Sequence, residues 1–146
     1  MTIAFVFPGQ GSQTVGMGKD LYDNFKSAKD IFDETSDALD INFAKMIFDG
    51  DAETLNKTEN AQPALMCVSL AVVNVLKKEF GFDITVRGAY LAGHSLGEYS
   101  ALCAARSLSV RDTAKLLRFR GEAMNRAVSR TDNDLAAHKA EYSPRE

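Results

Sequence analysis

The residues best suited to chemistry lie in GAYLAGHSLGEYSALCAA, the stretch from Gly88 to Ala105. Here Ser95 stands between Gly93 and Gly97, directly after a short apolar run. A strand that leads into GxSxG and then into a helix is typical of a nucleophile elbow, a turn so tight that small residues must flank the serine. The following backbone N–H would lie at a helix start, where it can hold an oxyanion. Ser95 is therefore the candidate nucleophile.

A nucleophilic serine of this kind needs a base to accept its proton. His94 precedes Ser95, but neighbouring side chains at a sharp turn diverge, which favours a packing or hydrogen-bonding role for His94. His138 is the only histidine further along the chain. We do not assign it as the base, because a base must be positioned as well as present.

The elements around the serine are predicted from hydrophobic periodicity. Ile3 to Phe7 is continuously apolar and predicts a strand buried on both faces of a parallel sheet, with a second strand over Gly88 to Ala92. Pro63 suits the first turn of a helix that is apolar nearly all round and ends at Gly81. Further helices are expected within Lys19 to Asp49, over Leu96 to Ala105, and after Ser109, which forms a capping box with Asp112.

The glycine-rich loop after the first strand, PGQGSQTVGMG, does not fit a nucleotide-binding motif. The dinucleotide pattern GxGxxG would need glycine at Thr14, and the P-loop pattern would need lysine at Met17. The specific signal for phosphate binding is absent from this loop.

Composition excludes several classes of protein. The 146 residues suit one domain, and 45% hydrophobic and 25% charged residues with a net charge of -3 are ordinary for a globular chain. The first ten residues have no basic region, so no secretory signal is expected and a cytoplasmic location is the default. We expect no metal site, no bound cofactor, no membrane span and no nucleic-acid partner. Cys67 and Cys103 are expected to be buried free thiols.

Positive charge is concentrated late in the chain. Arg106 to Arg130 holds seven basic residues against two acidic ones. A solvated helix face is the ordinary interpretation, and a surface that receives an acidic partner or phosphates is the functional one.

Four separated segments, FVFPGQGSQTVGMG, TENAQPAL, GHSLGEYSAL and RFRGEAM, occur in the order seen in malonyl-CoA:acyl carrier protein transacylases. The chain closely resembles this family over residues 1–128. The resemblance implies an α/β fold, a three-layer, parallel-sheet, hydrolase-like acyltransferase subdomain. It also implies malonyl transfer from malonyl-CoA, through a malonyl-serine at Ser95, to the phosphopantetheine thiol of acyl carrier protein in fatty-acid biosynthesis.

The resemblance also implies roles for residues of the matching motifs. The backbone N–H groups of Gln10 and Leu96 would form the oxyanion hole. Arg120 of RFRG would pair with the free malonyl carboxylate, for which a planar guanidinium is well suited. Gln62 of AQPAL would line the substrate pocket, or alternatively cap the start of its helix.

The chain departs from the family pattern at Ser129. In this family the base is a histidine that follows the serine by roughly a hundred residues, beyond a small ferredoxin-like subdomain, and the surroundings of His138 do not match it. We therefore expect an incomplete, truncated large subdomain over 1–128, a non-matching, disordered tail over 129–146, and impaired or lost turnover. Uncovered sheet edges and apolar helix faces should result.

Two other functions remain open at this point. One is a non-catalytic remnant that binds acyl carrier protein or CoA through the basic segment. The other is a serine hydrolase, because lipases and thioesterases share GxSxG. Arg120 and the PGQGSQ loop favour malonyl transfer over hydrolysis.

Overall fold

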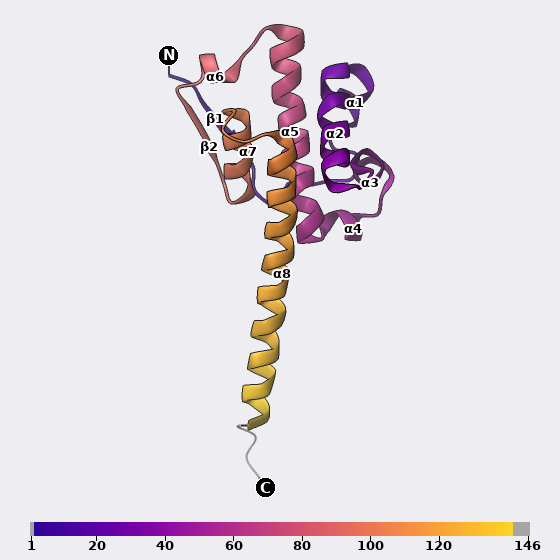
Figure 1. Cartoon of the computed structure of the whole chain (residues 1–146), viewed down its shortest axis with the longest axis vertical. Helices are drawn as coiled ribbons and strands as arrows, with labels where there is room; N and C mark the ends of the chain where they lie inside the picture. The colour runs from indigo at the N-terminus through magenta and orange to yellow at the C-terminus, as the bar shows by residue number, and fades with distance from the viewer. Residues whose placement is uncertain (1, 142–146) are drawn as a thin grey trace.

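The computed structural model describes the backbone of residues 2–141 and the side chains of residues 2–129. The elements, in chain order, are β1 (Ala4–Phe7), α1 (Lys19–Asn24), α2 (Lys26–Leu39), α3 (Phe43–Asp49), α4 (Ala52–Asn56), α5 (Thr58–Phe80), α6 (Ile84–Arg87), β2 (Tyr90–Gly93), α7 (Leu96–Ala104) and α8 (Val110–Glu141). The sheet lies at one side of the body and packs against α7, whereas α5 and α8 contact α7, and α1 to α3 lie beyond α5 (Figure 1). The predicted α/β class is confirmed.

β1 and β2 form a two-stranded parallel sheet in which Phe5 lies opposite Leu91. Side chains of alternate residues point to opposite faces. Phe7 is buried against the helices, whereas Val6 is 73% and Tyr90 is 67% exposed. The prediction that the first strand is buried on both faces is therefore wrong for the outer face, because none of the described residues covers it.

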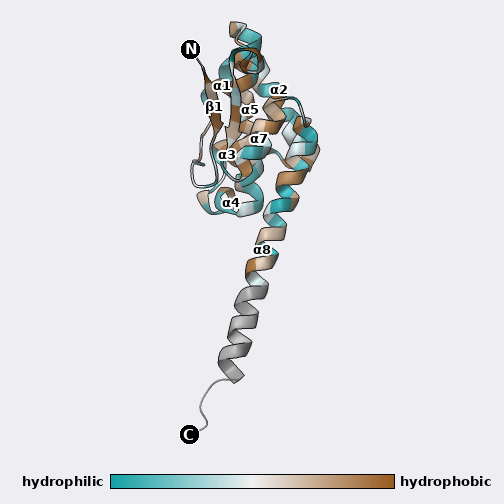
Figure 2. Ribbon diagram, turned by 90° about the vertical axis from the view of Figure 1, so that its left-hand side faces the viewer, coloured by the Kyte–Doolittle hydropathy of each residue, from teal (hydrophilic) through white to brown (hydrophobic). Residues whose placement is uncertain are grey.

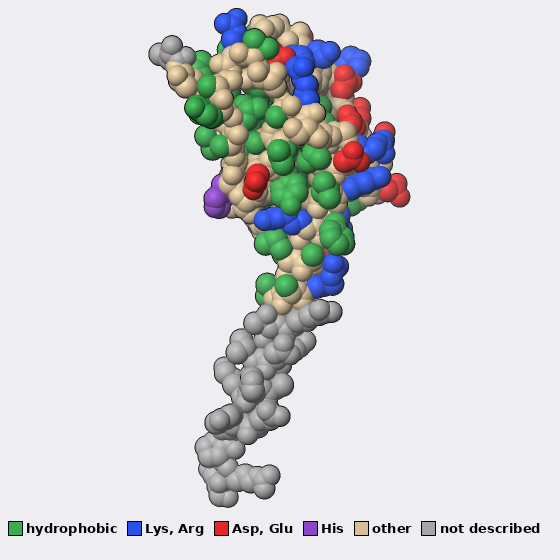
Figure 3. Space-filling model, turned by 60° about the vertical axis from the view of Figure 1, so that its left-hand side comes forward, with side chains coloured by type: hydrophobic (Ala, Val, Ile, Leu, Met, Phe, Trp, Pro, Cys, Tyr) green, Lys and Arg blue, Asp and Glu red, His purple; other side chains and the backbone are tan. Residues whose placement is uncertain are grey.

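Hydrophobic residues run along β1 and the helices beside it, as the hydropathy colouring shows (Figure 2). Others gather at the surface on the side of the molecule that carries the sheet (Figure 3). The buried core includes Phe32, Phe43, Met66 and Leu117, from α2, α3, α5 and α8. No helix within the described part of the chain is long and apolar enough to cross a membrane.

The central helix α5 begins earlier than its sequence suggests. It starts at Thr58, so the prediction that Pro63 occupies the first helical turn is wrong. Proline has no N–H to donate, so Pro63 leaves the carbonyl of Glu59, four residues earlier, without its intrahelical donor. Arg118 of α8 donates a long hydrogen bond of 3.4 Å to that carbonyl instead. The predicted end of the helix at Gly81, with φ of 64°, is confirmed.

α8 crosses the first turn of α5 at very short range. A Cβ atom on Gly121 would lie 2.5 Å from the Cα atom of Glu59 and 2.7 Å from its backbone nitrogen. Only glycine fits this approach. Asn125 donates to the Glu59 carboxylate, and Arg118 donates to the side-chain oxygen of Asn60, so polar contacts flank the crossing on α8.

The start of α8 has the predicted cap, and its end differs from the sequence-based expectation. The Asp112 N–H donates to Ser109 Oγ at 3.0 Å, which confirms the expected cap. The helix then continues to Glu141, so residues 129–141 are helical where an irregular tail was expected. No glycine or proline lies between Gly121 and Pro144 to end the helix earlier. The domain boundary at 128 stays a prediction, and residues 142–146 lie outside the described residues.

Replacing Gly121 with alanine separates helix propensity from packing. Propensity alone would stabilise the chain by about 1 kcal/mol. Because the added methyl group would meet the α5 backbone, we expect Gly121→Ala to destabilise it by about 1–3 kcal/mol, as overpacking does. Urea unfolding measures the difference. Lys115→Ala, at an exposed position of the same helix, is the control and should change stability by less than about 0.5 kcal/mol. A more stable Gly121→Ala chain would contradict the close crossing.

The buried thiol of Cys67 gives a second test of the packing. Burial raises the pKa of the Cys67 thiol to about 12, and its side chain is fully buried. The thiolate is the reactive form, so iodoacetamide at pH 8 should leave Cys67 unmodified in the folded chain and modify it in urea. Peptide mass spectrometry after each treatment reads this directly. Rapid modification of Cys67 without denaturant would show that α5 is not packed as described.

Candidate active site

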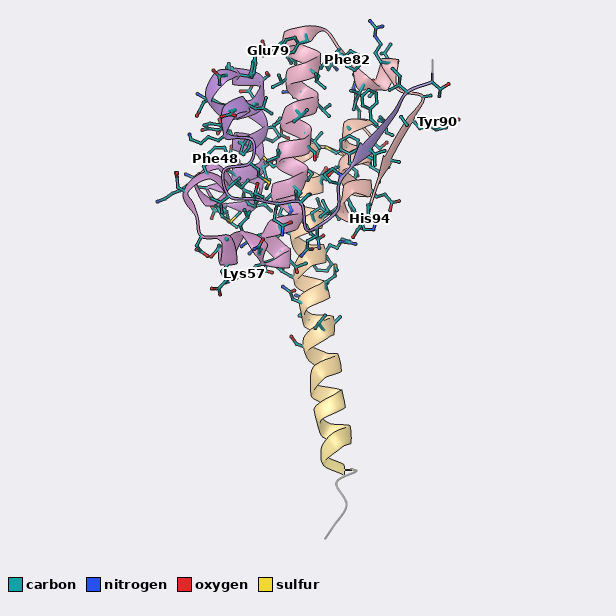
Figure 4. All side chains as sticks on the ribbon, turned by 180° about the vertical axis from the view of Figure 1, so that it is seen from behind. Phe48, Lys57, Glu79, Phe82, Tyr90 and His94 are labelled. Atoms are coloured by element: carbon teal, nitrogen blue, oxygen red, sulfur yellow. The ribbon has the colours of Figure 1, made fainter. Side chains whose placement is uncertain are left out.

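The candidate site lies where the strands end and α5 begins. His94, at the end of β2, and Lys57, just before α5, lie toward one end of the body, whereas Glu79 and Phe82 lie toward the other (Figure 4). Ser95 lies in the turn between β2 and α7. In parallel α/β sheets this carboxyl edge is the usual place for a ligand.

The turn around Ser95 has the geometry of a nucleophile elbow. Ser95 has φ of 55° and ψ of -113°, which is strained for a residue with a side chain. A Cβ atom on Gly93 would overlap the backbone of Gly97, and one on Gly97 would overlap the carbonyl of Phe7. The tight turn that the GxSxG pattern predicts is therefore present, and both glycines are needed for it.

Arg120 of α8 connects the serine to the core. Its Nη2 donates to Ser95 Oγ at 3.0 Å, and its Nη1 donates to Gln62 Oε1 at 2.7 Å. Gln62 is fully buried in α5, and its Nε2 lies 3.4 Å from the sulfur of Met124. Side chains of α5, of α8 and of the turn before α7 thus meet at one guanidinium. The alternative of a helix-capping role for Gln62 is wrong, because α5 begins four residues before it.

The positive charge of Arg120 has neutral partners. Among the side chains of residues 2–129, no carboxylate forms an ion pair with it. A guanidinium has five N–H donors, of which these two contacts use two. The remaining donors and an uncompensated charge lie beside the Ser95 hydroxyl, which is an arrangement suited to binding an anion.

Tyr99 is a site residue that the sequence reasoning missed. The Cζ atom of Arg120 lies 5.8 Å from the centre of the Tyr99 ring, within the range of a cation–π contact. Tyr99 lies in the first turn of α7, four residues after Ser95, which immediately precedes that helix. That spacing in GHSLGEY is the signal that could have found it.

The two predicted oxyanion donors belong to elements that meet at the elbow. Leu96 is the first residue of α7, and no described residue accepts a hydrogen bond from its N–H or from that of Gln10. The loop that carries Gln10 reaches the elbow, because a Cβ atom on Gly9 would lie 2.5 Å from the His94 ring. The side chain of Gln10 donates to Thr58 Oγ1 at 3.4 Å. Their role as oxyanion donors stays a prediction.

No base for Ser95 is found among the described side chains. His94 is exposed, its ring lies next to Gly9, and it makes no hydrogen bond to Ser95. Its backbone N–H donates to the carbonyl of Phe7 at 3.2 Å. The side chain of His138 lies outside the described residues. Within those residues, no group of three or more His, Cys, Asp or Glu side chains is arranged to hold a metal ion.

A scan against protein-family models matches residues 4–145 to the acyl transferase domain. The chain is 49% identical over 135 residues to the malonyl CoA-acyl carrier protein transacylase of Bacillus subtilis strain 168. That alignment covers 92% of the chain and 41% of the relative, so the chain spans about two fifths of its length.

Comparison with solved structures also finds malonyltransferases. An acyl-carrier-protein S-malonyltransferase from Bartonella henselae matches with a TM-score of 0.83 and 53% identity, over 86% of this chain and 40% of that one. A malonyl-transacylase in complex with its type II PKS acyl-carrier protein matches with a TM-score of 0.81 and 39% identity, over 87% and 40%. The family model matches nearly the whole length of this chain, and the turn at Ser95 has the geometry expected of a nucleophile elbow. This chain therefore belongs to the acyl transferase domain family.

Proposed function

We propose that this chain carries the nucleophile and the acyl-recognition residues of a malonyl-CoA:acyl carrier protein transacylase of fatty-acid biosynthesis. The observation that carries the proposal is Arg120, a guanidinium without a carboxylate partner among the described side chains, 3.0 Å from Ser95 Oγ. A malonyl group has a free carboxylate a few bonds from its thioester carbonyl. One site can therefore bind the carboxylate at Arg120 and present the carbonyl to Ser95.

The reaction is a double displacement. Ser95 Oγ attacks the thioester carbon and loses its proton, and the C–S bond breaks to release CoA as its thiol. In the tetrahedral intermediate, the former carbonyl oxygen is negative and would accept hydrogen bonds from the N–H groups of Leu96 and Gln10. The phosphopantetheine thiol of acyl carrier protein then takes the malonyl group from Ser95 by the reverse sequence of bond changes.

The names of the relatives support the proposed substrate, malonyl-CoA, and the proposed partner, acyl carrier protein. Those described above are named for malonyl CoA and acyl carrier protein, and one was solved with an acyl-carrier protein bound. The basic segment from Arg106 to Arg130 is the proposed surface for the acidic groups of these molecules. A cytoplasmic location remains part of the proposal.

A second candidate follows from the absence of a base for Ser95 among the described side chains of residues 2–129. Because no described side chain can take the Ser95 proton, the chain would acylate slowly, or would bind acyl carrier protein or CoA without turnover. Enzymes of the serine triad type that lose one member keep some catalysis from the oxyanion hole and from binding. We therefore favour slow acylation over binding alone. Hydrolysis of a neutral ester or thioester is disfavoured, because such a substrate has no carboxylate to pair with Arg120.

Acylation of Ser95 is the first test. After incubation with malonyl-CoA, intact-protein mass spectrometry should show the mass of one malonyl group added to the chain. Ser95→Ala, which leaves the helix start in place and removes only the hydroxyl, should show none. An adduct of equal yield on Ser95→Ala, or no adduct on the unaltered chain, would contradict the proposal.

Removing the charge at Arg120 tests how the acyl group is recognised. Arg120→Met should lower acylation by malonyl-CoA relative to acetyl-CoA by roughly 10- to 100-fold, since a charged hydrogen bond is worth about 1.5–3 kcal/mol. Competition between the two thioesters, followed by mass, measures this ratio. Arg111→Met, at an exposed position of the same helix outside the site, is the matched control. Equal malonyl selectivity in Arg120→Met would show that another group reads the carboxylate.

A further inference from the structure

The guanidinium of Arg120 is held from three sides. Gln62 Oε1 accepts from one terminal nitrogen at 2.7 Å, Ser95 Oγ accepts from the other at 3.0 Å, and the Tyr99 ring lies 5.8 Å from the central carbon. Gln62 is fully buried, so that contact is anchored in the core. The Ser95 hydroxyl is the reacting group and cannot serve as a permanent support. Among the described side chains, Tyr99 is the remaining contact of Arg120 that does not change during the reaction.

We propose that Tyr99 is a positioning residue for Arg120 and thereby a determinant of selectivity for acyl groups with a free carboxylate. The inference rests on the proposed function, because it assigns to Arg120 the binding of that carboxylate. Tyr99 itself need not touch the acyl group. It acts by limiting the orientations that the guanidinium plane can adopt.

The physical reason is that one hydrogen bond to Gln62 leaves the guanidinium free to pivot. A bidentate contact to a carboxylate requires the plane of the guanidinium to have one orientation. An aromatic ring attracts a cation to its face, by about 0.5–1 kcal/mol at an exposed site and more when water is excluded. Tyr99 is half-buried and packs against the core, so the ring is a fixed surface.

The position of Tyr99 in the chain adds a geometric consequence. Tyr99 lies in the first turn of α7, the helix that begins directly after Ser95, whereas Arg120 comes from α8. Contact with Tyr99 therefore fixes the arginine relative to the helix that begins at the nucleophile. The distance between the bound carboxylate and Ser95 Oγ is then set by α7 itself. An acyl group without a free carboxylate does not bind Arg120 and is not positioned by this contact.

The test compares two substitutions at Tyr99 in the full chain. The dissociation constant for malonate, measured by calorimetry or NMR titration, should rise about two- to five-fold in Tyr99→Leu, the range equivalent to 0.5–1 kcal/mol. Tyr99→Phe keeps the ring and should bind as the unaltered chain does. The ratio of acylation by malonyl-CoA to acylation by acetyl-CoA, which has no free carboxylate, should fall by the same factor in Tyr99→Leu and stay unchanged in Tyr99→Phe. A role in folding alone would lower both reactions together and leave this ratio unchanged.

Two further variants serve as controls. Tyr90→Leu removes a tyrosine from the outer sheet face, away from Arg120, and should leave malonate binding unchanged. If Tyr99→Leu fails to fold, as judged by its thermal transition, Tyr99→Met carries the comparison, because methionine fills a similar volume without a ring.

Each outcome has a distinct meaning. Unchanged malonate binding in Tyr99→Leu, or an equal loss in Tyr99→Phe, would overturn the inference and leave the proposed function standing. Malonate binding that is absent from the unaltered chain, or that survives in Arg120→Met, would overturn the proposed function and this inference with it.

Discussion

The candidate site depends on one contact, the close crossing of α8 over the first turns of α5. Gly121 lets the two backbones approach, and Arg118 donates to the Glu59 carbonyl that Pro63 leaves open. The residues that directly precede Pro63 and Gly121 in the sequence are the candidate functional residues. Gln62 precedes the proline and Arg120 precedes the glycine, so the crossing brings the two side chains within 2.7 Å. A wider crossing would separate the guanidinium from its buried support and from the serine.

The second constraint is the strained backbone of Ser95. A residue with a side chain in this conformation costs about 1–3 kcal/mol, which the surrounding packing must offset. Gly93 and Gly97 permit the turn, and Leu96 is buried directly after the serine, which ties the start of α7 to the core. The same geometry exposes the hydroxyl and leaves the Leu96 N–H without an acceptor among the described residues. The strain and the reactivity of the site therefore have one structural origin.

Local sequence predicts the parts of this structure that local interactions determine. The strand–GxSxG–helix turn, the cap at Ser109 and the end of α5 at Gly81 are of this kind. The start of α5 could not be predicted locally, because a proline inside a helix is tolerated here through a donor on α8. Burial of the outer sheet face was wrongly expected, since an apolar strand does not reveal which of its faces is covered. The contact of Arg120 with Tyr99 depends on the crossing, which no single segment encodes. The oxyanion roles of Gln10 and Leu96 remain predictions.

The most direct test of the account is a crystal structure of this chain with malonate bound. We expect one carboxylate against the guanidinium of Arg120, with the Gln62 contact kept and the other end of malonate directed toward Ser95. An Arg120 side chain turned away from Gln62 and Ser95, or malonate bound elsewhere with this site intact, would contradict it.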